Sequence, residues 1–481
     1  MNLLLIIPEI SVIGLALAIL LIDLWTPAAA KPRLGWLAAL GLVVILVMTL
    51  ADSVNTVSIT GFSGAYVYDG LGIFFKRFFL TAALLVVLMG IEFADRIPLG
   101  IAEFYALVLL ALAGMMFSSA INDFMLMFVA VELITVTFYV LVSFQRGRLL
   151  CLEAGVKYLI MGALSTAFLV FGIALLFASS SATNFSLLAS SAGSLAHDKL
   201  FWLGLVVMLV GLAFKIAAFP MQMWAPDVYQ GAPTPVTAFL AVASKAAGFV
   251  ILLRVLFVAV PYVARQWETL FIIVAGITIL YGNLCAIPQR NLKRLLGYSS
   301  IAQAGYLLLG IAALNRDGAQ AVVYYLLGYL FTLGAVFVVI GLVCRESEDV
   351  GALAGLNQRS PVLAAALAMG MISLGGIPPL AGFAGKFLLI KAVVEHAAFD
   401  PRYYYLALVM VAGVVISLYY YFGVVRAIYW PATPGENNAP IHISPPMKIS
   451  LAVCMAGMVY LGLFPNAVLT ATADAVKALK F

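Results

Sequence analysis

Long apolar runs recur along the whole chain, and they constrain its fold more than any other feature. Each run has about 20 residues, the length of a helix that crosses the hydrocarbon core of a bilayer. Helices are expected because a helix satisfies its own backbone hydrogen bonds in lipid. We predict an all-α membrane protein with about fourteen transmembrane helices. The predicted spans are residues 3–25, 34–52, 70–91, 100–119, 122–143, 155–178, 200–220, 234–260, 269–288, 295–314, 319–343, 361–397, 405–430 and 447–466.

The composition excludes a water-soluble domain of ordinary type. Of the 481 residues, 65% are apolar and only 10% are charged, whereas soluble domains are roughly one-quarter charged. The longest polar stretches, near residues 179–199 and 431–446, are expected to be loops. The net charge of +5 is attributed to basic residues that set membrane topology. No nucleic-acid partner is therefore expected.

Basic residues are concentrated in alternate loops, which predicts the orientation of the chain. The positive-inside rule places the loops after odd-numbered spans in the cytoplasm and both termini in the periplasm of a bacterial inner membrane. Lys76, Arg77, Lys477 and Lys480 are exceptions on the disfavoured side. The loops after odd-numbered spans hold Lys31, Arg33, Arg96, Arg146, Arg148, Arg290, Lys293, Arg294, Arg345, Arg359, Arg426 and Lys448, whereas the others hold Lys199, Arg265, Arg316 and Arg402.

No pattern in the chain is typical of a redox or nucleotide site. No glycine-rich phosphate loop opens a helix after a strand. The cysteines form no C-x-x-C pair and are expected to be small buried hydrophobes. The histidines fall in or near loops, where they are unsuited to hold a haem between helices. We therefore expect no cofactor and no metal in this chain. These residues are Cys151, Cys285, Cys344, Cys454, His197, His396 and His442.

Two Gly/Pro-rich breaks interrupt the helical pattern at membrane depth. The first covers residues 219–233 after span seven, and the second covers residues 373–383 inside span twelve. The breaks lie five spans apart, so spans four to eight and nine to thirteen are expected to be inverted five-helix repeats with discontinuous spans seven and twelve. Proline and glycine that merely kink packed helices are the alternative. The predicted divisions are residues 1–98 with three helices, 99–262 and 263–431 for the two repeats, and 445–481 for the last helix.

Four charged residues lie inside predicted spans and are the main functional candidates. Glu132, Lys215 and Lys245 have no opposite charge within helical reach on their own helices, and Lys386 follows the second break. A buried unpaired charge costs roughly 3 kcal/mol or more, so each needs a partner, water or a changed protonation state. We interpret the four residues as a path for protons. Static ion pairs that fix helix register are the alternative.

Other charged residues admit simpler interpretations. Glu153 and Lys157 stand at i, i+4 near the start of span six and are either relay residues or a helix-end ion pair. Glu9, Asp23 and Glu92 are expected to be ordinary charges near span ends. Lys391 and Glu395 form another i, i+4 pair, which we leave unassigned.

Four runs of sequence resemble the antiporter-like membrane subunits of respiratory complex I. They are residues 215–235 with the motif WAPDVYQGAPTP, residues 243–245, residues 291–302 with NLKRLLGYSSIA, and residues 375–386 with GGIPPLAGF before Lys386. The resemblance extends in order over spans four to thirteen. The chain looks most like the subunit N branch of this family. It stops just after span fourteen, without the long lateral helix of subunit L, and it has Lys386 where subunit M is expected to have a glutamate.

The resemblance implies two half-channels joined by a hydrated polar axis. Glu132 would pair with Lys215, Lys245 would relay protons along the axis, and Lys386 would be the terminal lysine. The complex passes electrons from NADH to quinone and pumps protons, with NADH, FMN, iron–sulfur clusters and quinone bound by other subunits. The implied partners are peripheral and membrane subunits, especially neighbouring antiporter-like and small membrane subunits, together with lipid and, through the complex, the quinone pool.

The chain departs from the family pattern at two positions. Gln222 and Gln303 stand where many relatives have histidine. A glutamine amide orients water but does not titrate near neutral pH, so both residues are relay candidates without proton exchange of their own. Two alternative functions remain open: a subunit of a multi-subunit cation/proton antiporter or membrane-bound hydrogenase, and a passive scaffold or quinone-binding module.

Overall fold

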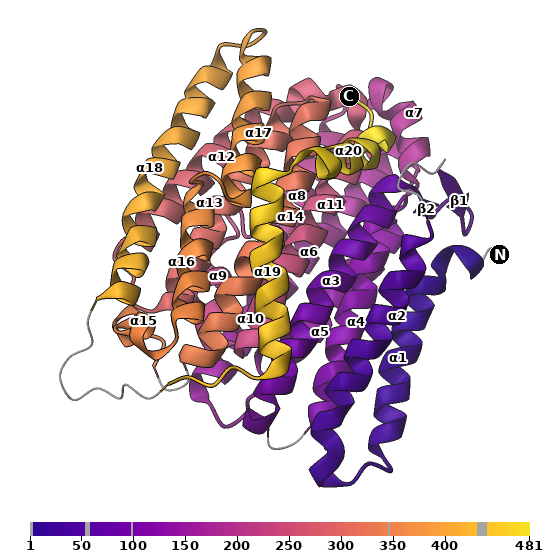
Figure 1. Ribbon diagram of the computed structural model, residues 1–481. Coiled ribbons are helices and arrows are strands. Elements are labelled where there is room, and N and C mark those ends of the chain that lie inside the picture. Colours follow the sequence, from indigo (N-terminus) through magenta and orange to yellow (C-terminus); the bar gives the residue numbers. More distant parts are fainter. Residues whose placement is uncertain (1–2, 53–57, 98–99, 345–346, 431–439) are drawn as a thin grey trace.

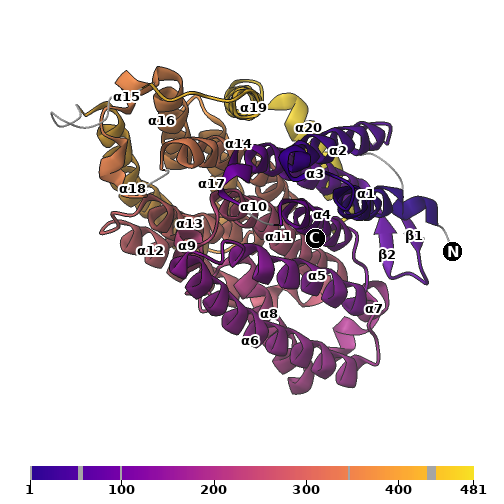
Figure 2. The same ribbon diagram turned by 90° about the horizontal axis from the view of Figure 1, so that it is seen from below.

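The computed structural model describes residues 3–52, 58–97, 100–344, 347–430 and 440–481. Arg345, the predicted boundary at residues 98–99 and the loop residues 431–439 lie outside the described residues. The described chain is an elongated bundle of helices with one small hairpin (Figure 1). Both views place the N-terminal helices at one end of the bundle and α18 at the other (Figure 2).

The N-terminal part pairs three long helices with the hairpin. Strand β1 runs antiparallel to β2, with Thr60 opposite Val67. Asp69 caps the third helix, because its carboxylate accepts the Gly72 N–H at 2.8 Å. The elements are α1 (Ile7–Asp23), α2 (Leu34–Leu50), β1 (Ile59–Gly61), β2 (Tyr66–Tyr68) and α3 (Gly70–Phe93).

The middle of the chain contains the first break. Helix α8 ends at Ile216, where Ala217 takes a left-handed conformation with a φ of 56°. After α10 the chain forms a π-helical segment, Leu240–Ser244, and a second one, Val255–Ala259, follows α11. The helices are α4 (Ile101–Ser119), α5 (Phe124–Val142), α6 (Leu149–Ser180), α7 (Phe185–Leu195), α8 (Lys199–Ile216), α9 (Trp224–Gly231), α10 (Thr234–Phe239) and α11 (Lys245–Arg254).

The last part contains the second break. Gly376 follows the last residue of α16 with a φ of 80°, a left-handed conformation that favours glycine, and a Cβ there would meet the aliphatic chain of Lys386 at 2.8 Å. The helices are α12 (Ala264–Ala286), α13 (Leu292–Ala312), α14 (Arg316–Val343), α15 (Leu356–Arg359), α16 (Pro361–Gly375), α17 (Ala381–Ala397), α18 (Arg402–Tyr429), α19 (Pro445–Leu463) and α20 (Asn466–Ala475).

The structure confirms the all-α membrane fold. Among the described residues, 13 helices are long and apolar enough to cross a membrane. The remaining predicted span, residues 361–397, is the pair α16 and α17 with the break between them. The predicted interruptions at spans seven and twelve are therefore present. The inverted relation of the two five-helix units stays a prediction.

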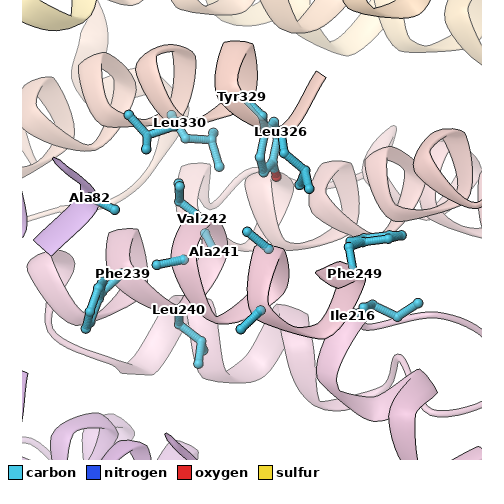
Figure 3. Close-up of a cluster of buried hydrophobic side chains, with 14 of the residues drawn as sticks. Ala82, Ile216, Phe239, Leu240, Ala241, Val242, Phe249, Leu326, Tyr329 and Leu330 are labelled. Atoms are coloured by element: carbon cyan, nitrogen blue, oxygen red, sulfur yellow. The ribbon is translucent and has the colours of Figure 1, made fainter. Parts of the chain in front are cut away.

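The buried centre of the bundle surrounds the helix that carries Lys245. Every residue of α10, of the first π-helical segment and of α11 is buried. Figure 3 shows Phe239, Leu240 and Phe249 from this stretch, with Leu326 and Leu330 of α14 facing it. Lys245 is therefore enclosed by protein rather than by lipid.

Candidate functional site

The first intramembrane group joins helices α5, α6 and α8. Thr166 donates a hydrogen bond to Glu132 Oε1 at 2.6 Å. Lys215, which is buried, donates to the Thr135 hydroxyl. Thr135 lies one helical turn from Glu132 on the same face of α5. No contact within 4 Å joins the Glu132 carboxylate to the Lys215 ammonium in the described structure. The expected ion pair therefore stays a prediction. Thr135, which accepts a hydrogen bond from Lys215, connects that lysine to the helix of Glu132.

Lys245 lies at the crossing of α11 and α13. Its Nζ donates to the Ser300 carbonyl oxygen at 2.5 Å and also to the Ser300 hydroxyl. The Tyr229 hydroxyl lies 2.9 Å from the same Ser300 hydroxyl. The π-helical segment Leu240–Ser244 ends immediately before Lys245, and such segments are frequent at functional sites. Lys245 of the first predicted repeat is thus bonded to Ser300 of the second.

A line of buried polar side chains continues from Lys245 along α13. Ser299, Ser300 and Gln303 share this helix, and all three are buried. The Tyr421 hydroxyl lies 2.5 Å from Ser299 Oγ and accepts from Gln303 Nε2 at 3.1 Å. Tyr325 donates to Gln303 Oε1. We call Ser299, Ser300, Gln303 and Tyr421 the polar axis.

The polar axis ends at Lys386 beside the second break. Lys386 Nζ donates to the Leu374 carbonyl oxygen at 2.7 Å, and Gln303 Nε2 donates to the same oxygen at 3.3 Å. Leu374 lies in the last turn of α16, where the helix dipole favours a cation. The ammonium also lies 4.8 Å from the centre of the Tyr306 ring. Neutral hydrogen-bonding groups therefore surround both Lys245 and Lys386, and the two sets meet at the adjacent residues Ser299 and Ser300 of α13.

The three buried lysines share one chemical property. Lys215, Lys245 and Lys386 bond hydroxyl and carbonyl oxygens, and no carboxylate lies within 4 Å of any of them in the described part of the chain. A buried ammonium without a carboxylate is costly. Its charge state therefore depends strongly on neighbouring charges, as a proton-transfer site requires.

Glu153 and Lys157 belong to a wider charged group at a polar cavity of about 310 Å³. Lys157 bonds Glu153 at 2.7 Å and Asp227 at 2.8 Å, and Asp227 also pairs with Arg294. Gln230 joins the group by accepting from Arg294 at 3.2 Å. The cavity thus brings α6, α9 and α13 together at the predicted cytoplasmic side. Asp227 and Arg294 stand within the conspicuous runs WAPDVYQ and NLKR, which is the signal that marks them in the sequence.

Gln222 lies apart from the polar axis. It is buried in the first break, and its Oε1 accepts no hydrogen bond from the described residues. Nor does any hydrogen bond join it to Gln303 in the described part of the chain. The structure therefore brings together Lys245, Gln303 and Lys386, but it leaves Gln222 outside this group.

The structure corrects the interpretation of Glu9 as an ordinary charge near a span end. Glu9 is fully buried and pairs with buried Lys76 at 2.9 Å, and Tyr66 donates to the carboxylate at 2.9 Å. Beside this pair, Asp69 accepts two hydrogen bonds from Arg254, at 2.7 and 3.0 Å. The prediction was wrong because Glu9 is near the end of its own helix but is covered by other segments.

A second polar cluster lies at the opposite end of α17 from Lys386. Glu268 accepts from Tyr403 at 2.8 Å, and His396 lies 3.9 Å from the same carboxylate. Arg402 pairs with Asp400 at 2.5 Å, and its hydrogen bonds hold the pKa of the Asp400 carboxyl below its usual value. No group of three or more His, Cys, Asp or Glu residues suited to a metal was found among the described residues.

Comparison with known proteins decides the family. The profile of the family described as NADH:quinone oxidoreductase/Mrp antiporter, TM, matches residues 121–417. NADH-quinone oxidoreductase subunit N of Moorella thermoacetica is 38% identical over 97% of this chain and 96% of its own length. The chain belongs to the NADH-quinone oxidoreductase subunit N family. The family member from Trichlorobacter lovleyi is also 38% identical, over 99% of this chain and 98% of its own.

Solved structures agree with this assignment. A chain of respiratory complex I from Thermus thermophilus superposes with a TM-score of 0.81 and 33% identity, and covers 97% of this chain and 100% of its own. A chain of the Mrp complex from Dietzia sp. DQ12-45-1b superposes with a TM-score of 0.84 at 22% identity, covering 100% of this chain and 98% of its own, which shows a shared fold. Glu132, Lys215, Lys245 and Lys386 all lie within the matched family region.

Proposed function

We propose that this membrane subunit translocates protons for an NADH:quinone oxidoreductase through its three buried lysines and the polar axis. The observation that carries the proposal is a set of buried hydrogen bonds in the interior of an apolar bundle. One part joins Lys245 to Ser300, and the other runs from the adjacent Ser299 through Tyr421 and Gln303 to the Leu374 carbonyl oxygen that Lys386 also bonds. Hydroxyl groups both donate and accept hydrogen bonds, so they pass a proton without a net change of charge. NADH, FMN, iron–sulfur clusters and quinone would bind to other subunits.

The charged cavity supports a place for proton uptake. Glu153, Lys157, Asp227 and Arg294 surround it at the side predicted to be cytoplasmic. Two residues after Asp227, helix α9 presents Tyr229, whose hydroxyl is bonded to Ser300 beside Lys245. Helix α9 thus makes polar contacts at the cavity and, through Tyr229, with the Ser300 hydroxyl that Lys245 also bonds. We assign Glu153 and Lys157 to uptake rather than to the buried relay.

Lys245 would pass protons between two halves of the chain. In the proposed division, residues 99–262 hold Glu132, Lys215 and Lys245, and residues 263–431 hold the polar axis and Lys386. The described helices before residue 98 and from residue 445 onward pack against this pair of units. A proton on Lys215 would be stabilised by Glu132 through Thr135, and a proton on Lys386 by the carbonyl end of α16. Gln303 would orient groups of the relay without titrating.

The cellular setting follows from the family. The chain is a multi-pass protein of a bacterial membrane, and we place both termini in the periplasm from the distribution of basic loops. Its partners would be other subunits of the complex, especially neighbouring antiporter-like and small membrane subunits. The likeness to the Mrp complex keeps an antiporter subunit as the second candidate. Purification from native membranes distinguishes the two, because only the first predicts co-purifying flavin and iron–sulfur subunits.

The direct test is Lys245→Ala in the intact complex. In membrane vesicles we expect NADH-driven proton uptake to fall at least roughly tenfold, because a positioned proton carrier is lost. Lys31→Ala is the matched control, since Lys31 is partly exposed and pairs with Asp23 at a helix end. A variant that pumps normally with normal quinone reduction would support the passive scaffold and overturn the proposal.

A further inference from the structure

A large cavity lies away from the polar axis, between α18 and the α12–α13 connection. Its volume is about 680 Å³. Its lining includes the basic residues Arg290 and Arg426 and the apolar or aromatic residues Leu418, Tyr419 and Phe422. Leu418 lies eight residues before Arg426 on α18, so the groove extends about 12 Å along that helix. The groove thus combines a basic and an apolar lining.

The arginines of the lining have no acidic partner in the described structure. No carboxylate among the described residues lies within 4 Å of either guanidinium, and both residues are exposed. One acid, Asp349, also lines the cavity, but its Oδ1 caps a short helical turn by accepting the Gly351 N–H at 2.7 Å. Two cations and one anion leave the lining with a net charge of +1. That charge is complementary to one phosphodiester.

The apolar part of the groove continues a face of α18 that is exposed in the isolated chain. Tyr419 is 72% exposed and Phe422 is 48% exposed, and Val415, Val411 and Leu408 continue the same face. In a bilayer such a face contacts acyl chains. Arg426 stands in the last turn of α18, and the end of a membrane-spanning helix is expected to reach the headgroup region. Basic pockets between helices at this level bind anionic lipid headgroups.

We propose that this groove binds one anionic glycerophospholipid, with its phosphate between Arg290 and Arg426 and an acyl chain along Leu418 and Phe422. The groove is separate from the polar axis, but the two share helix α18. Tyr421 of the polar axis lies on α18 next to Phe422, facing inward. A lipid seated here therefore holds the helix that carries Tyr421.

The test uses the intact complex, delipidated and then titrated with phosphatidylglycerol vesicles. In R290Q/R426Q the phosphatidylglycerol concentration for half-maximal recovery of quinone reductase activity rises roughly tenfold. The reason is that each basic residue near an anionic lipid surface contributes to the free energy of binding. R290K/R426K, which keeps both charges, stays within about threefold of the wild type. R146Q is the matched control, because Arg146 is exposed in a loop on the same predicted side outside the groove.

Two further measurements make the proposal falsifiable without reference to activity. Phosphatidylglycerol retained by the purified complex falls in R290Q/R426Q, whereas the retention of phosphatidylcholine or inorganic phosphate does not distinguish the variants. Equal phosphatidylglycerol retention in wild type and R290Q/R426Q overturns the proposal. So does a photo-crosslinking residue at position 422 that captures a neighbouring protein subunit instead of lipid, because the groove is then a subunit interface.

Discussion

Two regions of this bundle bury charges in opposite ways. Near the hairpin, Glu9 meets Lys76 at 2.9 Å and Asp69 meets Arg254 at 2.7 Å. In the centre, the described hydrogen-bond partners of Lys215, Lys245 and Lys386 are all hydroxyl and carbonyl oxygens. A buried charge with an ion-pair partner keeps one protonation state, because the partner stabilises the charged form. The protonation state of a buried group without a counter-ion depends on its surroundings. We therefore expect the N-terminal pairs to be structural, and we propose the central lysines as the proton carriers.

The largest expected effect comes from breaking an N-terminal pair. Lys76→Met leaves Glu9 buried without its partner, which is expected to cost about 3 to 5 kcal/mol of stability. The melting temperature of the purified complex should fall by several degrees. Lys31→Met is the control, because its pair with Asp23 is partly exposed and such pairs contribute at most about 1 kcal/mol.

The double variant Glu9→Gln/Lys76→Met sharpens this prediction. It removes both charges, so most of the lost stability should return. Proton pumping should be close to normal in the double variant. If the double variant folds well but does not pump, Glu9 and Lys76 belong to the proton path and the comparison fails.

Lys215→Met is expected to show the opposite pattern. Pumping should fall roughly tenfold because a proton carrier is lost, whereas the melting temperature should not fall, because no described carboxylate loses a direct partner. Parallel measurement of proton uptake in vesicles and of thermal stability in detergent checks both parts. A loss of stability as large as that of Lys76→Met would show that Lys215 is held as a structural ion pair.

Tyr421→Phe tests the polar axis by removing one hydroxyl. The hydroxyl links Ser299 to Gln303, and loss of about 1 kcal/mol of hydrogen bonding predicts roughly a fivefold decrease in pumping. Tyr405→Phe is the matched control, since Tyr405 lies on the same helix, outside the groove, and is 73% exposed. Equal pumping rates in the two variants would remove Tyr421 from the relay.

Gln303→His should have the smallest effect on the rate but should change its pH dependence. An imidazole fits a relay position and titrates near pH 6.5 when unperturbed, so pumping should stay within about threefold and acquire a dependence on pH between about 6 and 8. Gln222→His is the control, because Gln222 lies outside the polar axis. A pH dependence that appears only with Gln222→His would place the relay in the first break.

The sequence predicted the spans, both breaks and the buried lysines, because each depends on local composition. It indicated Lys76 only as a topology exception and did not single out Arg254, although both sit in apolar runs much as Lys215, Lys245 and Lys386 do. Nor did it identify Tyr421 as a neighbour of Ser299 and Gln303. The distinction rests on partners from distant segments, since Asp69 and Arg254 are separated by 185 positions in the chain.

The sequence by itself determined that this chain spans a membrane as interrupted helices with charges in their interiors. A helix in lipid satisfies its own backbone hydrogen bonds, so hydropathy and Gly/Pro placement are sufficient. Only the tertiary structure decided which buried charges are neutralised and which are not. An ion pair between helices depends on where their faces meet, and that arrangement is set by packing over the whole bundle.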